Sequence, residues 1–137
     1  MPVYRCLPRI ARGPYYPAPL FRRFKRFAGN SMSAVSFAGL HVAIVTPFRA
    51  GGEVDWAAWT RLVDFHVQQG TDGLVIAGTT GESVTLEDGE VRELVLRAQA
   101  QANGRLRIVV GAGTSSTAGT VRRVQEFTAL PVDGVLV

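Results

Sequence analysis

The chain has 137 residues, of which 47% are hydrophobic, and carries a formal net charge of +4. This length is enough for one domain with a hydrophobic core. The single cysteine, Cys6, excludes an intramolecular disulfide and a cysteine-only zinc site, and no apolar run reaches the roughly 18–20 residues that a membrane helix needs. We therefore expect a cytoplasmic protein with no membrane partner.

The basic charge is concentrated in residues 1–31, which contain seven basic residues and no acidic one; residues 32–137 contain eight arginines and eleven acidic residues. Four of the five prolines in residues 1–31 would interrupt any long helix there, so we expect disorder, with a short helix at 20–28. Three interpretations remain open: translation that really begins at Met32, an arginine-rich targeting peptide, or a tail that binds nucleic acid or a membrane surface. We favour the first, and expect no nucleic-acid partner.

Regular structure is predicted from residue 40 onward. Residues 40–46 form an apolar, β-branched run that Pro47 ends, which is typical of a buried strand. Asp55 is a good N-cap for the helix that follows, and Gly70 lies where its C-terminal cap belongs. The apolar residues between them recur at helical spacing: Trp56, Trp59, Leu62, Val63 and Val67.

A second strand is predicted at residues 73–77. Thr85, with Asp88 three residues later, has the pattern of a capping box, so we expect a second helix to begin there. This helix should continue to Gly104.

The same alternation continues to the last residue of the sequence. Residues 107–110 predict a third strand, residues 117–130 a third helix, and residues 134–137 the start of a fourth strand. In the third helix, Val121, Val124 and Phe127 are expected to face inward.

Apolar strands that alternate with amphipathic helices indicate a parallel sheet covered by helices, an α/β fold. Two architectures share this pattern, the doubly wound sheet and the (β/α)₈ barrel, and periodicity does not separate them. In both, functional loops lie at the carboxyl ends of the strands.

One such loop, residues 78–83 with the sequence GTTGES, places Thr79 and Thr80 between Gly78 and Gly81. It is not a Walker phosphate loop, because no lysine follows the second glycine. Glycines let backbone N–H groups approach a ligand, and threonine hydroxyls add donors without adding charge. The loop therefore suits a small carboxylate, although a merely structural turn remains open.

Other candidate features favour structural interpretations. Residues 111–116 lack the third glycine of a dinucleotide fingerprint, because Ser116 stands in its place. His41 and His66 have no clustered acid, so we expect no metal site. Trp56 and Trp59 are expected to pack in the core.

Five segments resemble the N-terminal half of the dihydrodipicolinate synthase/N-acetylneuraminate lyase family. They are residues 43–48 (AIVTPF), 64–66 (DFH) with Gly70, 78–83 followed by Thr85-Leu86, 111–113 (GAG), and Ser116-Thr117. The resemblance implies that residues 32–137 are the N-terminal half of a (β/α)₈ TIM barrel, with about four strands and three helices. It also implies a pyruvate-dependent aldolase that forms a Schiff base, needs no cofactor and assembles as a homotetramer.

The resemblance assigns roles within the loop. Thr80 matches the position that binds the carboxylate of pyruvate, with Gly78 and Gly81 beside it, and Thr79 matches the hydroxyl of a proton relay. Two threonines favour the dihydrodipicolinate synthase type, in which pyruvate condenses with the aldehyde aspartate semialdehyde. The alternatives are N-acetylneuraminate lyase and an aldolase that acts on 2-keto-3-deoxy sugar acids.

The chain departs from the family pattern in the residues that perform the chemistry. In the family, the Schiff-base lysine and the relay tyrosines come from later parts of the barrel. This sequence holds its only lysine and its three tyrosines in the basic segment: Tyr4, Tyr15, Tyr16 and Lys25. We therefore expect the chain to be inactive alone. The alternative of another class is a non-catalytic truncated product that self-associates or pairs with another half barrel.

Feedback inhibition by lysine is expected to be weak or absent. Ser83 and Val84 are compatible with the regulatory pocket of lysine-sensitive family members. Four other positions depart from it: Asp88, Val91, Ser115 and Gly119.

Overall fold

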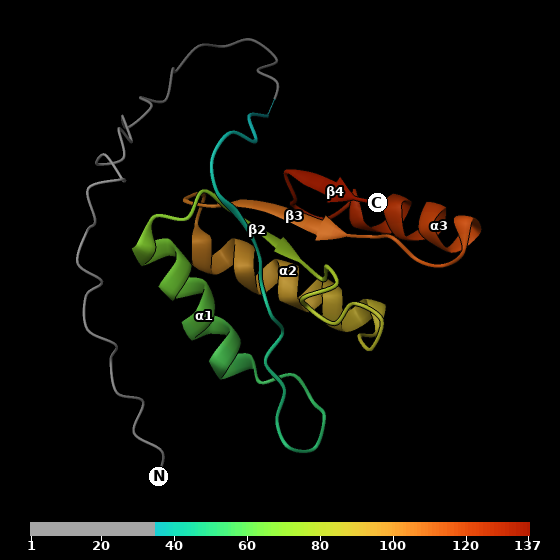
Figure 1. Ribbon diagram of the computed structural model, residues 1–137, viewed down its shortest axis with the longest axis horizontal. Coiled ribbons are helices and arrows are strands. Elements are labelled where there is room, and N and C mark those ends of the chain that lie inside the picture. Colours follow the sequence, from blue (N-terminus) through green and yellow to red (C-terminus); the bar gives the residue numbers. More distant parts are fainter. Residues whose placement is uncertain (1–34) are drawn as a thin grey trace, which may run out of the picture. The chain divides into compact units, whose positions relative to one another are not determined.

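The computed structural model describes residues 35–137 (Figure 1), so the expectations for residues 1–31, Lys25 included, lie outside the described residues. Strands and helices alternate, as the sequence predicts. They are β1 (His41–Ala43), α1 (Trp56–Gln69), β2 (Gly73–Ile76), α2 (Asp88–Ala102), β3 (Arg107–Gly111), α3 (Thr117–Phe127) and β4 (Gly134–Leu136).

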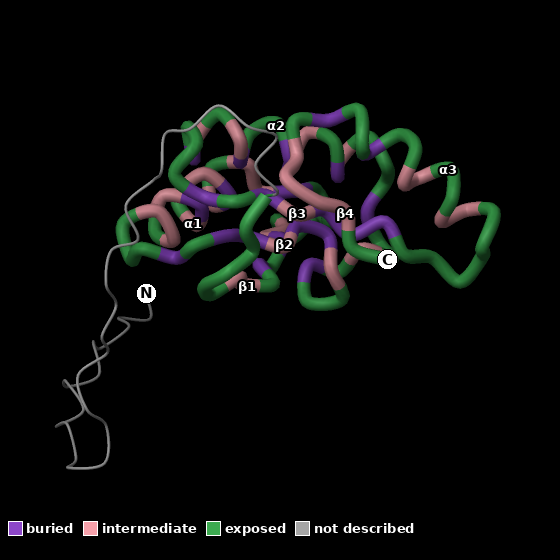
Figure 2. The backbone as a smooth tube through the Cα atoms, turned by 90° about the horizontal axis from the view of Figure 1, so that it is seen from above, coloured by how far each residue is buried: buried purple, intermediate pink, exposed green. Residues whose placement is uncertain are grey.

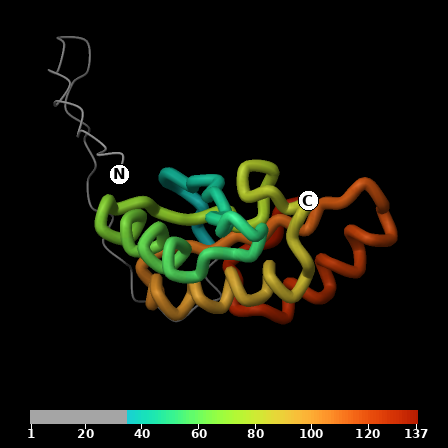
Figure 3. Tube along the Cα trace, turned by 90° about the horizontal axis from the view of Figure 1, so that it is seen from below, coloured from blue at the N-terminus to red at the C-terminus, as the bar shows by residue number. Residues whose placement is uncertain are grey.

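The four strands form one parallel sheet in the order β1-β2-β3-β4. One row of the register crosses the whole sheet, with Ala43 beside Val75, Val75 beside Val109, and Val109 beside Gly134. Helix α2 packs against β2 and β3 and against α1, and Figure 3 shows both helices below the strands. Each helix therefore returns the chain to the start of the next parallel strand, as in a (β/α)₈ barrel.

The core lies between the sheet and the helices, as the distribution of buried residues in Figure 2 shows. Trp59 is fully buried and donates a hydrogen bond from its indole Nε1 to the carbonyl of Leu94, 3.2 Å away. The packing expected for Trp59 is therefore confirmed. The strands and α2 contribute most of the remaining fully buried side chains: Leu74, Ile76, Val91, Leu94, Val95, Ile108 and Val110.

The caps of α1 agree with the sequence analysis. Asp55 Oδ1 accepts a hydrogen bond from the N–H of Ala58 at 2.9 Å, and this bond holds the pKa of Asp55 below its ordinary value of 3.8. Gly70 ends the helix in the left-handed conformation, with a φ of 74°. Residues that carry a side chain rarely adopt that backbone conformation, which explains the glycine at this position.

The predicted capping box of the second helix is wrong. Helix α2 begins after Glu87, whose carboxylate accepts a hydrogen bond from the N–H of Glu90, while the N–H of Glu87 donates to Oε2 of Glu90 at 3.0 Å. The hydroxyl of Thr85 instead donates to the carbonyl of Glu82 at 2.9 Å. The helix also ends before Gly104, because Asn103 already adopts the left-handed conformation with a φ of 46°.

Two other expectations need correction. The first strand is shorter than the predicted residues 40–46, because its regular pairing with β2 covers only His41–Ala43. The N–H of Ile44 still donates to the carbonyl of Val75 at 3.2 Å. In α3, Phe127 is fully buried, but Val121 is 51% exposed. Only the C-terminal turns of α3 pack on the core, so the first turns lack a surface to cover Val121.

Among residues 35–137, no helix is both long and apolar enough to cross a membrane. The same residues hold no group of three or more histidine, cysteine, aspartate or glutamate side chains that could bind a metal ion.

Candidate functional site

The carboxyl ends of β1, β2 and β3 meet at one edge of the sheet, because the strands are parallel and adjacent. The backbone that follows β2 turns sharply at this edge. Both the chain after β1 and the last residue of β3 contact that turn, through Thr46 and Gly111. The candidate site is therefore built from three strand ends that are distant in sequence.

The turn after β2 is held by its own backbone. The N–H groups of Gly81 and Ser83 donate to the carbonyl of Gly78, at 3.1 and 3.3 Å, and the N–H of Glu82 donates to the carbonyl of Thr79 at 3.1 Å. Ala77 and Glu82 take positive φ angles of 52° and 55°, which residues other than glycine rarely adopt. Such strained residues persist where the surroundings hold them, as they do here.

Thr79 and Thr80 lie at the exposed tip of this turn, whereas Gly78 is partly buried and Gly81 is buried. Within residues 35–137, the N–H groups and hydroxyls of Thr79 and Thr80 have no hydrogen-bond partner. The structure thus brings the four loop residues named from the sequence into one turn. It leaves two adjacent residues with accessible, uncommitted donors.

Thr46 ties the turn to the end of the first strand. Its side chain is 5% exposed, and its hydroxyl donates to the carbonyl of Gly81 at 2.8 Å. A Cβ at Gly81 would lie 3.0 Å from the carbonyl oxygen of Ile44, so the two backbones are in close contact. Sequence reasoning missed Thr46; the one signal was a hydroxyl that closes an apolar run just before Pro47.

Gly111 supports the turn from the other side. A Cβ at this position would lie 2.2 Å from the carbonyl oxygen of Ala77, which is backbone and has little room to move. The glycine is therefore required by the approach of β3 to the turn after β2. The sequence alone indicated only a structural role for residues 111–116.

Residues 111–116 behave as a structural turn. Ser116 caps α3, with its Oγ accepting a hydrogen bond from the N–H of Gly119 at 3.2 Å, and the N–H of Thr114 donates to the hydroxyl of Thr120 at 3.0 Å. These hydroxyls are committed to the helix start, unlike those of Thr79 and Thr80.

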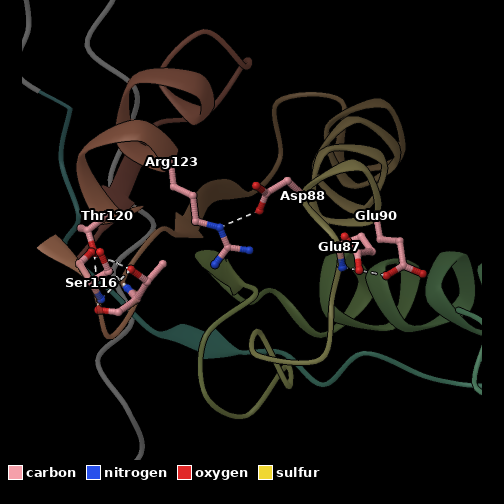
Figure 4. Close-up of polar contacts among 7 residues, drawn as sticks. Glu87, Asp88, Glu90, Ser116, Thr120 and Arg123 are labelled. Carbon is pink, nitrogen blue, oxygen red and sulfur yellow. Dashed lines mark hydrogen bonds and ion pairs between the residues drawn. The ribbon is translucent and has the colours of Figure 1, made fainter. Parts of the chain in front are cut away.

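A surface pocket of about 360 Å³ lies between α2 and α3. Its lining residues are Asp88, Thr114, Gly119, Arg122, Arg123 and Glu126. Arg123 Nε lies 2.6 Å from Asp88 Oδ1, an ion pair that joins the two helices (Figure 4). Of the positions considered for lysine feedback, Asp88 is thus paired within the chain, and Val91 is fully buried in the core.

The two histidines lie away from the candidate site. His41 begins β1, and its ring packs against Phe37 with the centroids 5.8 Å apart. His66, near the end of α1, contacts the hydroxyl of Thr71 through Nδ1 at 3.1 Å, and burial lowers its pKa. Both are at the end of the sheet opposite to Thr79 and Thr80, so they take no part in that site.

Residues 36–137 match the model of the dihydrodipicolinate synthetase family. The chain is 42% identical over 101 residues to a 4-hydroxy-tetrahydrodipicolinate synthase of Thermotoga maritima, a match that covers 74% of this chain and 34% of the relative. The chain spans about a third of the length of the curated relatives it matches.

Solved structures agree in fold. A chloride-inhibited dihydrodipicolinate synthase from Acinetobacter baumannii, complexed with pyruvate, is 37% identical with a TM-score of 0.68, over 71% of this chain and 33% of that one. An N-acetylneuraminate lyase from Proteus mirabilis is 26% identical with a TM-score of 0.65, over the same shares of the two chains. Such structures are TIM barrels, and the chain corresponds to about a third of each.

Proposed function

The chain belongs to the dihydrodipicolinate synthetase family, and from this membership we propose that residues 35–137 supply the carboxylate-binding part of a Schiff-base aldolase site. The reaction is the condensation of pyruvate with aspartate semialdehyde, as in 4-hydroxy-tetrahydrodipicolinate synthase. The observation that carries the proposal is the turn after β2, where Thr79 and Thr80 hold uncommitted donors at the carboxyl edge of the sheet.

These donors suit the carboxylate of pyruvate. Hydrogen bonds to a carboxylate are charge-assisted and stronger than those between neutral groups. In this proposal Thr80 binds the carboxylate, beside the backbone of Gly78 and Gly81. Thr79 contributes a hydroxyl that both donates and accepts, as a proton relay requires.

The proposal requires an amine that residues 35–137 do not hold. These residues contain no lysine and no tyrosine. A hydroxyl does not replace an amine in imine formation. We therefore propose that the chain alone is catalytically inactive and contributes half of a site.

Two alternatives rest on specific observations. The likeness to the N-acetylneuraminate lyase of Proteus mirabilis supports an aldolase for sialic acid or a 2-keto-3-deoxy sugar acid. Exposed apolar side chains within the chain, such as Val45 and Val84, support a non-catalytic product that associates with itself or with another half barrel. The paired threonines and the higher identity to the synthases favour the first proposal.

The remaining properties are proposed from the resemblance to the family. We propose that the complete enzyme works in the cytoplasm as a homotetramer, without a cofactor. We also propose that lysine inhibits it weakly or not at all. The burial of Val91 and the ion pair of Asp88 with Arg123 support weak inhibition, because Val91 is closed off from an effector and Asp88 already has a charged partner.

A chimera tests the proposed activity. Residues 35–137 are joined to the later two thirds of the Thermotoga maritima relative, and the chimera is assayed with pyruvate and aspartate semialdehyde, and separately for cleavage of N-acetylneuraminate. We expect the condensation of pyruvate with aspartate semialdehyde to dominate.

In the same chimera, Thr80→Val should raise the KM for pyruvate about tenfold, as loss of one charge-assisted hydrogen bond predicts. Thr79→Val should lower kcat by about 100-fold or more.

The control is Thr128→Val, an exposed threonine at the end of α3 whose hydroxyl bonds only within its own helix end. It should leave both kinetic constants unchanged. If the chimera is active and Thr80→Val leaves the KM for pyruvate unchanged, the carboxylate role of Thr80 is wrong.

A further inference from the structure

Thr46 lies outside the proposed carboxylate-binding turn, yet it contacts that turn directly. Thr46 and Thr71 are the buried polar residues in the described part of the chain, with exposures of 5% and 8%. The hydroxyl of Thr46 is committed to the carbonyl of Gly81, so it does not contact a ligand itself. A buried hydroxyl that bonds the backbone of a functional turn is a candidate for positioning that turn.

The hydrogen bonds of the turn connect Thr46 to Thr80 in two steps. The hydroxyl of Thr46 bonds the carbonyl of Gly81 at 2.8 Å, and the N–H of the same peptide unit, contributed by Glu82, bonds the carbonyl of Thr79 at 3.1 Å. Both ends of one planar peptide are therefore held. That peptide belongs to a residue with a φ of 55°, which would relax without such restraint.

The second step fixes the orientation of a proposed donor. The carbonyl of Thr79 belongs to the Thr79–Thr80 peptide, and in a trans peptide the N–H points opposite to the C=O. No cis peptide is present in the described chain. Holding the carbonyl of Thr79 on one side therefore directs the N–H of Thr80 to the other, where it has no partner among residues 35–137.

We infer that Thr46 is a positioning residue that presets the N–H of Thr80 for a carboxylate, through the Gly81–Glu82 and Thr79–Thr80 peptides. The inference rests on the proposed function, because it deepens the account of how the same turn binds pyruvate. Preorganised donors bind more tightly than mobile ones because less ordering is left for the binding step. Loss of the Thr46 hydroxyl should thus affect affinity as well as stability.

The full chain is sufficient for the test, which compares Thr46→Val with Thr46→Ser. Valine keeps the size of threonine and loses the hydroxyl, whereas serine keeps the hydroxyl. The matched control is Thr71→Val, which removes the other buried hydroxyl, at the opposite end of β2. Amide NMR resonances of residues 78–83 are followed as pyruvate is added, and amide hydrogen exchange is measured without pyruvate.

We expect Thr46→Val to weaken the apparent Kd for pyruvate about tenfold, which corresponds to about 1.4 kcal/mol. The amide of Glu82 should exchange at least about tenfold faster in this variant, because its bond to Thr79 is no longer held. Thr46→Ser should restore both values. Thr71→Val should lower the melting temperature without changing either value.

Two results would overturn the inference: an unchanged Glu82 exchange rate in folded Thr46→Val, or an equal effect in Thr71→Val. Absence of pyruvate-induced shifts in the wild-type chain would instead count against the proposed function, and Glu82 exchange would still decide the positioning role. If Thr46→Val does not fold, the exchange rate of the Thr46 hydroxyl proton in the wild-type chain tests the inference. The inference requires a slowly exchanging Thr46 hydroxyl resonance, and rapid exchange there contradicts it.

Discussion

Gly111 and Gly89 should respond in opposite ways to a single added methyl group. Alanine at Gly111 would bring its Cβ against the carbonyl of Ala77, so we expect Gly111→Ala to lower the free energy of unfolding by about 1–3 kcal/mol, the usual cost of overpacking. A Cβ at Gly89, in the first turn of α2, meets nothing within 4 Å, so Gly89→Ala should raise this free energy by up to about 1 kcal/mol. Urea unfolding measures both. Shifts of the same sign would contradict the packing at β3.

His66 should make stability depend on pH. Burial lowers its pKa from the ordinary value of 6.5, so the unfolded chain binds more protons than the folded chain below that pH. The contribution of His66 is fully present above pH 6.5 and is lost as the pH falls below it. We expect His66→Gln to flatten this part of the stability profile, measured by urea midpoints between about pH 5 and 8. A profile that keeps the wild-type slope would assign the pH dependence to other groups.

At the residue scale, the sequence predicted the exposed part of the candidate site but not its support. Thr79 and Thr80 are recognisable because two hydroxyls stand between two glycines just after an apolar strand. Thr46 was not recognisable, because its partner lies 35 residues away and the hydrogen bond exists only once β1 and β2 are paired. The role of Gly111 likewise depends on the neighbouring strand.

At the element scale, the start of α3 should depend on one of two adjacent serines. Ser116 supplies the N-cap oxygen, whereas Ser115 is exposed and makes no hydrogen bond within residues 35–137. We expect Ser116→Ala to cost about 1 kcal/mol of unfolding free energy and Ser115→Ala to change it by less than about 0.5 kcal/mol. Thermal unfolding of the two variants gives the comparison, and equal losses would show that the cap does not hold α3.

The boundaries of the elements were predicted less well than the elements themselves. The pattern at Thr85 and Asp88 satisfies the capping-box rule in sequence, but Glu87 and Glu90 satisfy it in the structure. Thr85 is already engaged by the turn after β2, through its hydroxyl and its N–H, both of which donate to Glu82. The capping-box rule considers only local sequence, so it does not reveal that the preceding turn already uses Thr85 and leaves the box to Glu87 and Glu90.

At the scale of the whole molecule, alternation alone left two parallel-sheet folds open. The structure favours the barrel, because the strands follow one another in the order β1-β2-β3-β4 without reversal, and α1 and α2 lie on one side of the sheet. A doubly wound sheet would reverse its strand order and place helices on both faces. The sequence could not separate them because each strand and helix has the same local pattern in both folds.

We propose that this chain carries the carboxylate-binding turn of an aldolase site but not the amine that forms the imine. Borohydride trapping with pyruvate, read by intact mass, tests it most directly, with the chimera as the positive control. We expect a reduced pyruvate adduct on the chimera and none on the 137-residue chain. A stable adduct on the 137-residue chain itself would show that an amine of this chain forms the imine, and the proposed division of the site would be wrong.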